Sequence, residues 1–213
     1  MRQLADCYLY GIVDLGYVEE SAAVDMVHAM IRGGVDLIQL RGKNVVIEKL
    51  TDIAAELHKV TSDSGVPLVV NDHAQIAREV PVEGVHVGQD DASVNSARTT
   101  VGRPIWVGKS THSVEQARAA QREGADYIGF GPLYATPTKP DYIPIGLSPI
   151  SQVQDEIRCP IFCIGGIKLE NLPDVTAAGA KRVVIVSGLL QAHDVVGYAA
   201  RCKQLLTTVN QSL

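Results

Sequence analysis

Eight short apolar runs alternate with helix-like segments along nearly the whole chain, and this alternation constrains the fold more than any other feature. The runs span residues 7–14, 37–41, 67–72, 84–88, 105–110, 127–132, 160–166 and 182–188. They are rich in Val and Ile, and many are apolar at consecutive positions. That pattern is typical of parallel strands that are covered on both faces.

Helical periodicity fills the intervals between these runs. Residues 21–34 begin with Ser21 as the expected N-cap, and residues 113–124 begin with Ser113 followed three positions later by Gln116, a capping box. Gly124 is the expected stop of that second helix. Further helical patterns cover 46–65, 168–179 and 195–209, with a shorter segment at 91–102. Strict alternation of strand and helix predicts a parallel sheet with right-handed crossovers.

Eight such units in 213 residues fit a closed (β/α)8 TIM barrel, with residues 1–213 forming a single domain. Hydrophobic residues make up 46% of the chain, which is enough for a sizeable core. The alternative is an open, doubly wound α/β sheet. It is less favoured because no Gly-x-Gly-x-x-Gly pattern follows the first strand.

Charge and cysteine content exclude several classes of protein. A net charge of -5 without any Lys/Arg run argues against nucleic-acid binding, and no apolar run approaches membrane-spanning length. The N-terminus lacks the pattern of a signal peptide, and no Cys-x-x-Cys occurs. We therefore expect a cytoplasmic protein with four reduced thiols that acts on small molecules. The oligomeric state stays open, a homo-oligomer included.

Polar residues and glycines collect where the predicted strands end. In barrels of this kind the active site lies at the C-terminal ends of the strands. Those positions hold Gln39, Arg41, Lys43, Asn71, Asp72, Gln89, Asp90, Asp91, Ser110, His112, Gly165, Gly166, Ser187 and Gly188, and the sixth strand is followed by GPLYATPTKPDY with Thr136, Thr138 and Lys139. Each has an ordinary structural interpretation, such as a helix cap for Asp72 or a hydrogen-bonded scaffold role for His112. Their recurrence at successive strand ends predicts one site.

The residue types indicate what this site binds. Arg41, Lys43 and Lys139 are cations, whereas Asp72 and Asp91 are carboxylates. Two carboxylates about 4 Å apart would repel each other by roughly 4 kcal/mol at an effective dielectric near 20. Mg²⁺ removes that repulsion, since it prefers one or two carboxylates together with phosphate oxygens and water. The glycine-containing ends of the last two strands can supply backbone N–H groups to a second phosphate.

Six motifs carry a resemblance to a known family. QLRGK, VND, GVHVGQDD, GKSTHS, DYIGFGPLYATPTKP and IGGI occur in the order and spacing of the thiamine phosphate synthase family. The resemblance covers nearly the whole chain. It implies a Mg²⁺-dependent transferase that joins hydroxymethylpyrimidine diphosphate to thiazole phosphate, giving thiamine phosphate and diphosphate.

The resemblance also implies roles for individual residues. Contacts to the pyrimidine diphosphate would come from Gln39, Arg41, Lys43, Asn71, Ser110 and Lys139, among which Arg41, Lys43, Ser110 and Lys139 would be catalytic. Mg²⁺ would be held by Asp72 and Asp91. The thiazole phosphate would contact Thr136, Thr138, Gly166, Val186 and Ser187.

Two other functions remain open at this level. A thiazole tautomerase-like isomerase shares the fold, but it would need neither both aspartates nor the Thr-x-Thr-Lys loop. A non-catalytic sensor of thiazole or thiamine phosphate is kept open by Gly42, where the family usually has Glu. We expect Gly42 to be tolerated, because the charged contacts would come from Arg41 and Lys43. The sequence does not decide whether a carboxylated thiazole phosphate is the acceptor, or whether residues 133–147 close over it.

Overall fold

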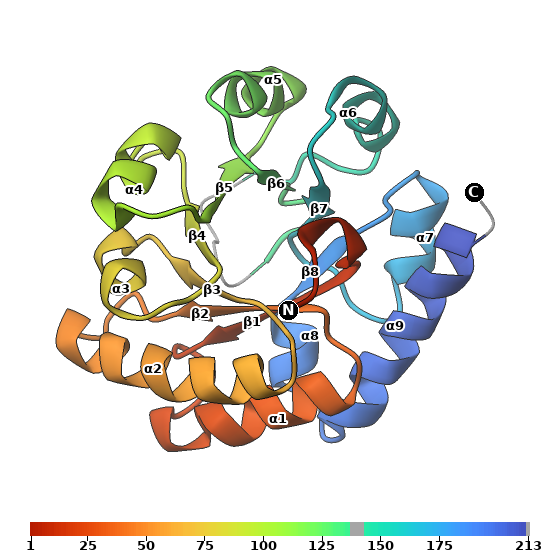
Figure 1. Cartoon of the computed structure of the whole chain (residues 1–213). Coiled ribbons are helices and arrows are strands. Elements are labelled where there is room, and N and C mark those ends of the chain that lie inside the picture. Colours follow the sequence, from red (N-terminus) through yellow and green to blue (C-terminus); the bar gives the residue numbers. More distant parts are fainter. Residues whose placement is uncertain (137–142, 212–213) are drawn as a thin grey trace.

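The structure, a computed structural model, is described for residues 1–136 and 143–211. Eight parallel strands close into a barrel in chain order, with β8 pairing back to β1 (Figure 1). The strands are β1 Leu9–Asp14, β2 Leu37–Arg41, β3 Leu68–Asn71, β4 Gly84–Val87, β5 Trp106–Thr111, β6 Tyr127–Phe130, β7 Ile161–Cys163 and β8 Val183–Ile185. The expected (β/α)8 barrel is confirmed.

Helices surround this barrel (Figure 1). They are α1 Ala23–Arg32, α2 Ile47–Asp63, α3 Ala74–Glu79, α4 Val94–Val101, α5 Val114–Arg122, α6 Ile150–Glu156, α7 Leu172–Ala177, α8 Ser187–Leu190 and α9 Val195–Gln211, with 3-10 turns η1 Leu4–Asp6 and η2 Glu20–Ala22. The sequence analysis did not predict α6 or α8. Ser187 and Gly188 belong to α8, so the expectation that they end the last strand is wrong.

Two of the helix starts show how local sequence acts. Ser113 accepts a hydrogen bond from the Gln116 N–H at 3.2 Å, while the Gln116 side chain accepts from the His112 N–H at 2.7 Å. The capping box is therefore present, shifted by one residue on its return bond. The predicted cap at Ser21 is wrong. The 3-10 turn η2 occupies that position, and α1 starts at Ala23 with Ala22 as an N-cap that makes no side-chain bond.

Both faces of each strand are buried, as the consecutive apolar positions predicted. Residues such as Leu9, Val85 and Ile128 pack between the strands and the helices. Alternate positions point inward and form a second cluster that includes Tyr10, Tyr127 and Phe162, whose ring centroids lie 5.3 to 6.1 Å apart. The barrel interior is thus a packed aromatic core below its C-terminal mouth.

The Tyr127 ring occupies the space that a side chain at position 108 would need, so only glycine fits there. A Cβ at this position would lie 2.1 Å from Tyr127 Cζ, and Tyr127 is fully buried. Gly108→Ala is therefore expected to lower the free energy of unfolding by about 2–3 kcal/mol, the cost of overpacking a rigid core. Gly129→Ala is the matched control, because its Cβ would be 3.5 Å from the nearest atom, His86 Cε1. Urea unfolding of both variants checks this; equal midpoints would contradict it.

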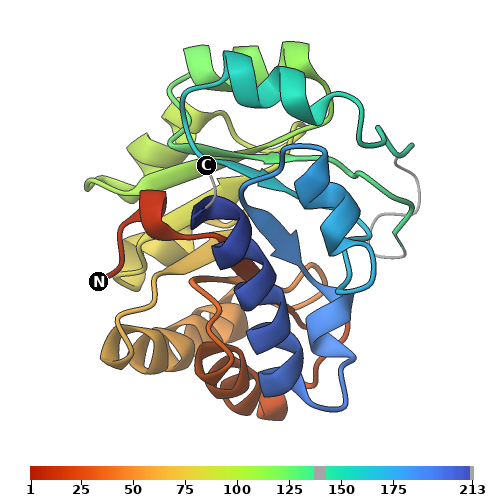
Figure 2. The same ribbon diagram turned by 90° about the vertical axis from the view of Figure 1, so that its right-hand side faces the viewer.

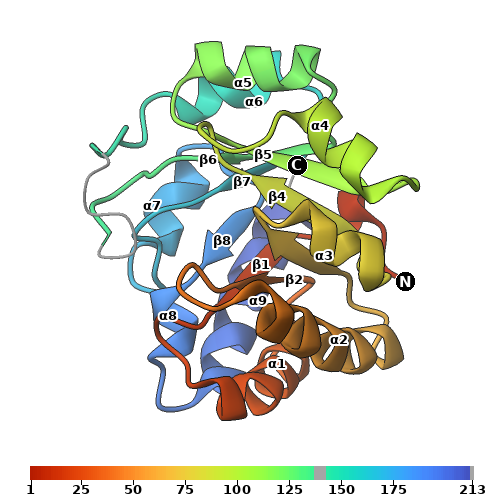
Figure 3. The same cartoon turned by 90° about the vertical axis from the view of Figure 1, so that its left-hand side faces the viewer.

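The opposite end of the barrel is closed by a charged cluster. Asp36 is buried, accepts hydrogen bonds from the Tyr8 and Leu9 N–H groups, and pairs with Arg2 and Lys203. The N-terminal segment lies at this end, whereas α8 lies at the other (Figures 2 and 3). The charged cluster around Asp36 therefore lies at the end of the barrel away from α8.

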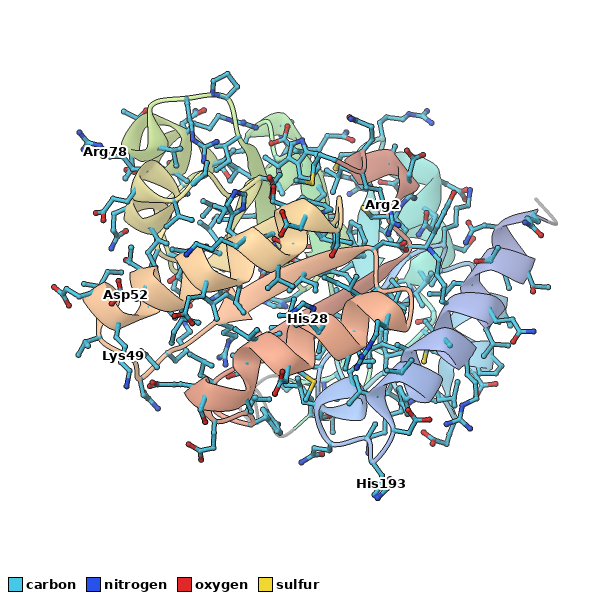
Figure 4. The ribbon with its side chains drawn as sticks, turned by 60° about the horizontal axis from the view of Figure 1, so that its bottom comes forward. Arg2, His28, Lys49, Asp52, Arg78 and His193 are labelled. Carbon is cyan, nitrogen blue, oxygen red and sulfur yellow. The ribbon has the colours of Figure 1, made fainter. Side chains whose placement is uncertain are left out.

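The outer helical faces are polar. Side chains such as His28 on α1 and Lys49 and Asp52 on α2 project away from the barrel (Figure 4). Within the described ranges, no helix is long and apolar enough to cross a membrane. The four cysteines are free thiols, and three of them are buried, as expected.

Candidate active site

A pocket opens at the C-terminal ends of the strands. Ten residues that the sequence analysis placed in one site line it together: Gln39, Arg41, Asn71, Ser110, His112, Thr136, Gly165, Gly166, Val186 and Ser187. They come from β2, β3, β5 and the residue that follows it, the segment after β6, and the segments after β7 and β8. Residues two apart on one strand share a face, which is why Gln39 and Arg41 both point into the barrel.

Arg41 is held in this pocket by a residue that the sequence analysis did not single out. Its guanidinium forms an ion pair with Asp14 at the end of β1, next to β2. The Asp14 side chain is 3% exposed and that of Arg41 is 15% exposed. Asp14 also accepts a hydrogen bond from the Gly16 N–H at 2.9 Å. Asp14 and Arg41 are in register at the ends of neighbouring strands. The presence of a polar residue at the end of each of these two strands is the sequence signal that could have predicted the pair.

Three further predicted residues gather at the rim rather than inside the pocket. Lys43 Nζ lies 2.5 Å from Asp72 Oδ2, and the Asp91 carboxyl lies beside Asp72. Asp91 also accepts a hydrogen bond from the Gly88 N–H at 2.8 Å. Burial raises the pKa of Asp72, Lys43 partly lowers it, and the neighbouring Asp91 raises it further. The rim thus concentrates negative charge that a cation would offset.

Asp72 adopts a left-handed backbone conformation with φ of 62°. It is not the cap of α3, since that helix has His73 at its N-cap without a side-chain bond. The ordinary interpretation of Asp72 as a helix cap is therefore excluded. A non-glycine residue in this region is uncommon, and such positions cluster at functional sites.

The donor set at this rim fits Mg²⁺. Within residues 1–136 and 143–211, no three His, Cys, Asp or Glu side chains converge into a group that could hold a metal ion. Two adjacent carboxylates are nevertheless what Mg²⁺ uses when phosphate oxygens and water complete its shell. Asp72 and Asp91 therefore suit an ion that arrives with a phosphorylated ligand.

The two glycines after β7 are required by packing as well as by the backbone. Gly165 and Gly166 have φ of 97° and 65°. A Cβ at Gly165 would lie 2.3 Å from Pro132 Cβ, and one at Gly166 would lie 2.7 Å from Tyr134 Cβ. The segment after β6 thus packs directly on these glycines. This brings Thr136 to the same pocket wall as Gly166.

A short helix faces these glycines. Val186 and Ser187, at the start of α8, line the pocket beside Gly166. Barrels commonly bind phosphate between the loops after strands seven and eight and the N-terminus of a short extra helix. Gly188 is also explained by packing, because a Cβ there would lie 2.6 Å from the Tyr198 hydroxyl.

Other predicted positions differ in what the structure shows. Thr138 and Lys139 lie outside the described residues. His112 lines the pocket, and its Nδ1 lies 2.5 Å from the Gly131 carbonyl oxygen, consistent with a scaffold role. Below the mouth, His86 Nε2 lies 3.0 Å from Ser110 Oγ, and Gln39 Nε2 donates to the Tyr10 hydroxyl at 2.6 Å. Sequence patterns gave no sign of these interior contacts.

The chain resembles proteins of one family over nearly its full length. The family model described as thiamine monophosphate synthase matches residues 9–189. A thiamine-phosphate synthase from Chloroflexus aurantiacus is 40% identical over 212 residues, covering 99% of this chain and 97% of that protein. One from Halalkalibacterium halodurans is 38% identical over 209 residues, covering 98% of each.

Solved structures share the fold of this chain. Thiamine phosphate pyrophosphorylase from Pyrococcus furiosus superposes with a TM-score of 0.87 at 28% identity, covering 95% of this chain and 96% of that one. A 3-hexulose-6-phosphate synthase superposes with a TM-score of 0.70 at 18% identity, covering 92% and 98%. The second likeness concerns the fold alone.

Proposed function

The chain belongs to the thiamine monophosphate synthase family and is a transferase of thiamine biosynthesis, and we propose that it joins 4-amino-2-methyl-5-(diphosphooxymethyl)pyrimidine to thiazole phosphate. The products are thiamine phosphate and diphosphate. The observation that carries this proposal is that one pocket is lined both by Arg41 at the end of β2 and by Gly166 and Ser187 after β7 and β8. Two anionic groups of different fate can bind there at once.

The diphosphate end of the donor lies at Arg41 and the rim. Arg41 is a fixed fork of donors because Asp14 holds its guanidinium. Lys43 adds a second cation, and Lys139 a third, as proposed from the sequence alone. Negative charge grows on the leaving oxygen as its bond to the pyrimidine methylene breaks, so these cations stabilise the transition state more than the bound substrate.

The acceptor lies against the part of the pocket formed after β6, β7 and β8. Thr136, Thr138, Gly166, Val186 and Ser187 bind its phosphate, through neutral donors suited to an anion that is held but not cleaved. This fixes the thiazole nitrogen beside the pyrimidine methylene. No strong base is needed, because that nitrogen already carries a lone pair. The protein contributes orientation and charge neutralisation.

Asp72 and Asp91 are the residues that would hold Mg²⁺. Bound there, the ion would neutralise the diphosphate and offset the repulsion between the two carboxylates. The raised pKa of Asp72 supports this role, since a neighbouring carboxylate and burial both oppose its charge until a cation is present.

The geometry at Gly42 supports an enzyme over a sensor. Gly42 is buried, and a Cβ there would lie 2.8 Å from Leu50 Cδ1 and 3.2 Å from Leu15 Cδ1. Leu50 and Leu15 thus fill the space beside Gly42, so the absence of a side chain there leaves no cavity next to Arg41 and Lys43. The tautomerase-like isomerase is less supported as well, because that reaction has no use for the paired carboxylates at Asp72 and Asp91.

One experiment separates the three candidates. The protein is mixed with both substrates and Mg²⁺, and diphosphate and thiamine phosphate are measured, each substrate being omitted in turn. The transferase releases diphosphate only when both substrates are present. An isomerase would convert the thiazole phosphate alone, and a sensor would bind without any product.

Thr136 tests the acceptor wall. Thr136→Ala is expected to raise KM for thiazole phosphate about tenfold, with kcat little changed, because it removes one hydrogen bond made equally before and during reaction. Lys139→Ala should instead mainly lower kcat. Thr99→Ala on α4 is the control, since its hydroxyl only bonds the Asn95 carbonyl. An equal KM effect of Thr136→Ala and Lys139→Ala, with kcat unchanged, would contradict this division.

Three wider features belong to the same proposal. Residues 1–213 act as one barrel domain. The four free thiols support a reducing compartment, hence the cytoplasm. Partners are the two small-molecule substrates.

A further inference from the structure

A chain of polar side chains crosses the barrel interior beneath the pocket. The interior polar chain consists of Gln39, Tyr10, Tyr127, His86 and Ser110. Its contacts are Gln39 Nε2 to the Tyr10 hydroxyl at 2.6 Å, Tyr10 to Tyr127 at 3.1 Å, Tyr127 to His86 Nδ1 at 3.2 Å, and His86 Nε2 to Ser110 Oγ at 3.0 Å. Gln39 and Ser110, the two ends of the chain, line the pocket, and so do Tyr10 and His86.

The two tyrosines in the middle of this chain are buried and keep their protons. Tyr10 is 1% exposed and Tyr127 is fully buried, with Phe162 packed edge-on against both rings. Burial raises the pKa of each phenol well above its usual range. Each hydroxyl therefore carries one proton and needs one acceptor, since a buried O–H without an acceptor is costly.

These protons set the direction of every bond. Gln39 donates a hydrogen bond to the Tyr10 oxygen, so the Tyr10 hydroxyl donates to the Tyr127 oxygen. The Tyr127 hydroxyl then donates to His86 Nδ1, which must carry no proton in order to accept this hydrogen bond. A neutral imidazole of that tautomer carries its proton on Nε2, which donates to Ser110 Oγ.

The two ends consequently offer opposite polarity to the pocket. Ser110 Oγ accepts a hydrogen bond from His86 Nε2, so its own O–H is available as a donor to the pocket. Gln39 donates one of its two amide N–H groups to Tyr10, which anchors the amide and leaves its Oε1 as an acceptor for the ligand. An acceptor beside a donor complements a 4-aminopyrimidine edge, whose amine donates and whose ring nitrogen accepts. A 4-oxopyrimidine presents the reverse.

We propose that Tyr10, Tyr127 and His86 are specificity-determining positioning residues, which fix Ser110 as a donor and Gln39 as an acceptor so that the pocket selects a 4-aminopyrimidine over a 4-oxopyrimidine. This inference rests on the proposed function for the identity of the ligand. It goes beyond that function by assigning selectivity to side chains that act through Gln39 and Ser110.

The test compares two unreactive ligands by calorimetry. They are 4-amino-2-methyl-5-hydroxymethylpyrimidine monophosphate and its 4-oxo counterpart, neither of which carries a diphosphate leaving group. The native protein should bind the amino ligand at least about a hundredfold tighter, as sites built around a substrate hydrogen bond reject its mismatch. In Tyr127→Phe the chain is cut, Ser110 can turn either way, and this ratio should fall about tenfold, the worth of one buried hydrogen bond.

Two further variants exclude a merely structural effect. Tyr8→Phe makes the same chemical change at the other end of the barrel, where the Tyr8 ring packs under Arg182 and Lys203, and should leave the ratio unchanged. At position 86, His86→Leu should lower the ratio as Tyr127→Phe does, whereas His86→Gln keeps an amide donor and should restore part of it. KM for thiazole phosphate should stay constant in Tyr127→Phe.

The outcomes separate this inference from the proposed function. Selective binding of the amino ligand without thiamine phosphate formation would overturn the proposed function and leave the inference standing. An unselective native protein, or a ratio unchanged in both Tyr127→Phe and His86→Leu, would overturn the inference whether or not the enzyme turns over.

Discussion

Arg41→Met is expected to have the largest effect of any single change considered, lowering both stability and turnover. It leaves the Asp14 carboxylate buried at 3% exposure without its cation. Breaking a buried ion pair in this way costs about 3–5 kcal/mol of unfolding free energy. Turnover should fall by about 100-fold or more, because one lost donor to developing charge costs that much. Denaturant unfolding and steady-state kinetics measure the two effects.

A double variant separates the two roles of Arg41. In Asp14→Asn/Arg41→Met no lone charge is buried, and the Asn oxygen can still accept the Gly16 N–H. Stability should return to within about 1 kcal/mol of the native protein, while turnover stays low. Lys49→Met is the matched control, since its pair with Glu20 is surface-exposed and worth about 0–1 kcal/mol. Native stability in Arg41→Met would contradict this account.

Asp72→Asn is expected to lower activity without lowering stability. It removes one of the two carboxylates that would hold Mg²⁺, so kcat should fall about 100-fold and the Mg²⁺ concentration for half-maximal rate should rise. Asp72 is a cleaner probe than Asp91, whose carboxylate also holds the Gly88 N–H. Full activity of the native protein in a chelator would contradict the metal assignment.

Stability of Asp72→Asn without metal should not fall. The pKa of Asp72 is raised in the folded protein, so its ionised form destabilises the fold as pH rises above the ordinary carboxyl range. Asparagine removes that charge and tolerates the positive φ at this position. Loss of the Lys43 pair opposes this gain only weakly, because the Lys43 side chain is 48% exposed. Asp90→Asn, an exposed neighbour of Asp91, is the control for both measurements.

The fold and the pocket face were predictable because they depend on periodicity. Consecutive apolar residues gave the parallel strands, and the alternation in QLR gave Gln39 and Arg41 the same direction. Lys43 and Asp72 were expected in the same mouth and lie 2.5 Å apart. Element boundaries were harder to predict. The last strand was expected to extend to residue 188 but ends at Ile185. The four residues of α8 that follow are too few to show a helical period in the sequence.

What could not be predicted depends on contacts between distant strands. Nothing in VHV indicates that His86 meets Ser110 and Tyr127, which are 24 and 41 residues away. Asp14 looked like any strand-end carboxylate until its register with Arg41 was known. The glycines after β7 had an ordinary turn interpretation, and the structure adds that Pro132 and Tyr134 pack against them. The types of residue in the site could be read from the sequence, whereas the contacts between them depend on which strands become neighbours in the fold.

The measurement that tests the account most directly is a crystal structure of the protein with thiamine phosphate, diphosphate and Mg²⁺. The account predicts the aminopyrimidine between Gln39 and Ser110 and the thiazole phosphate against Gly166 and Ser187. Diphosphate should lie beside Arg41, with the metal ion on the Asp72 and Asp91 carboxylates. A thiazole phosphate bound at Arg41, or ligands outside the barrel mouth, would contradict it.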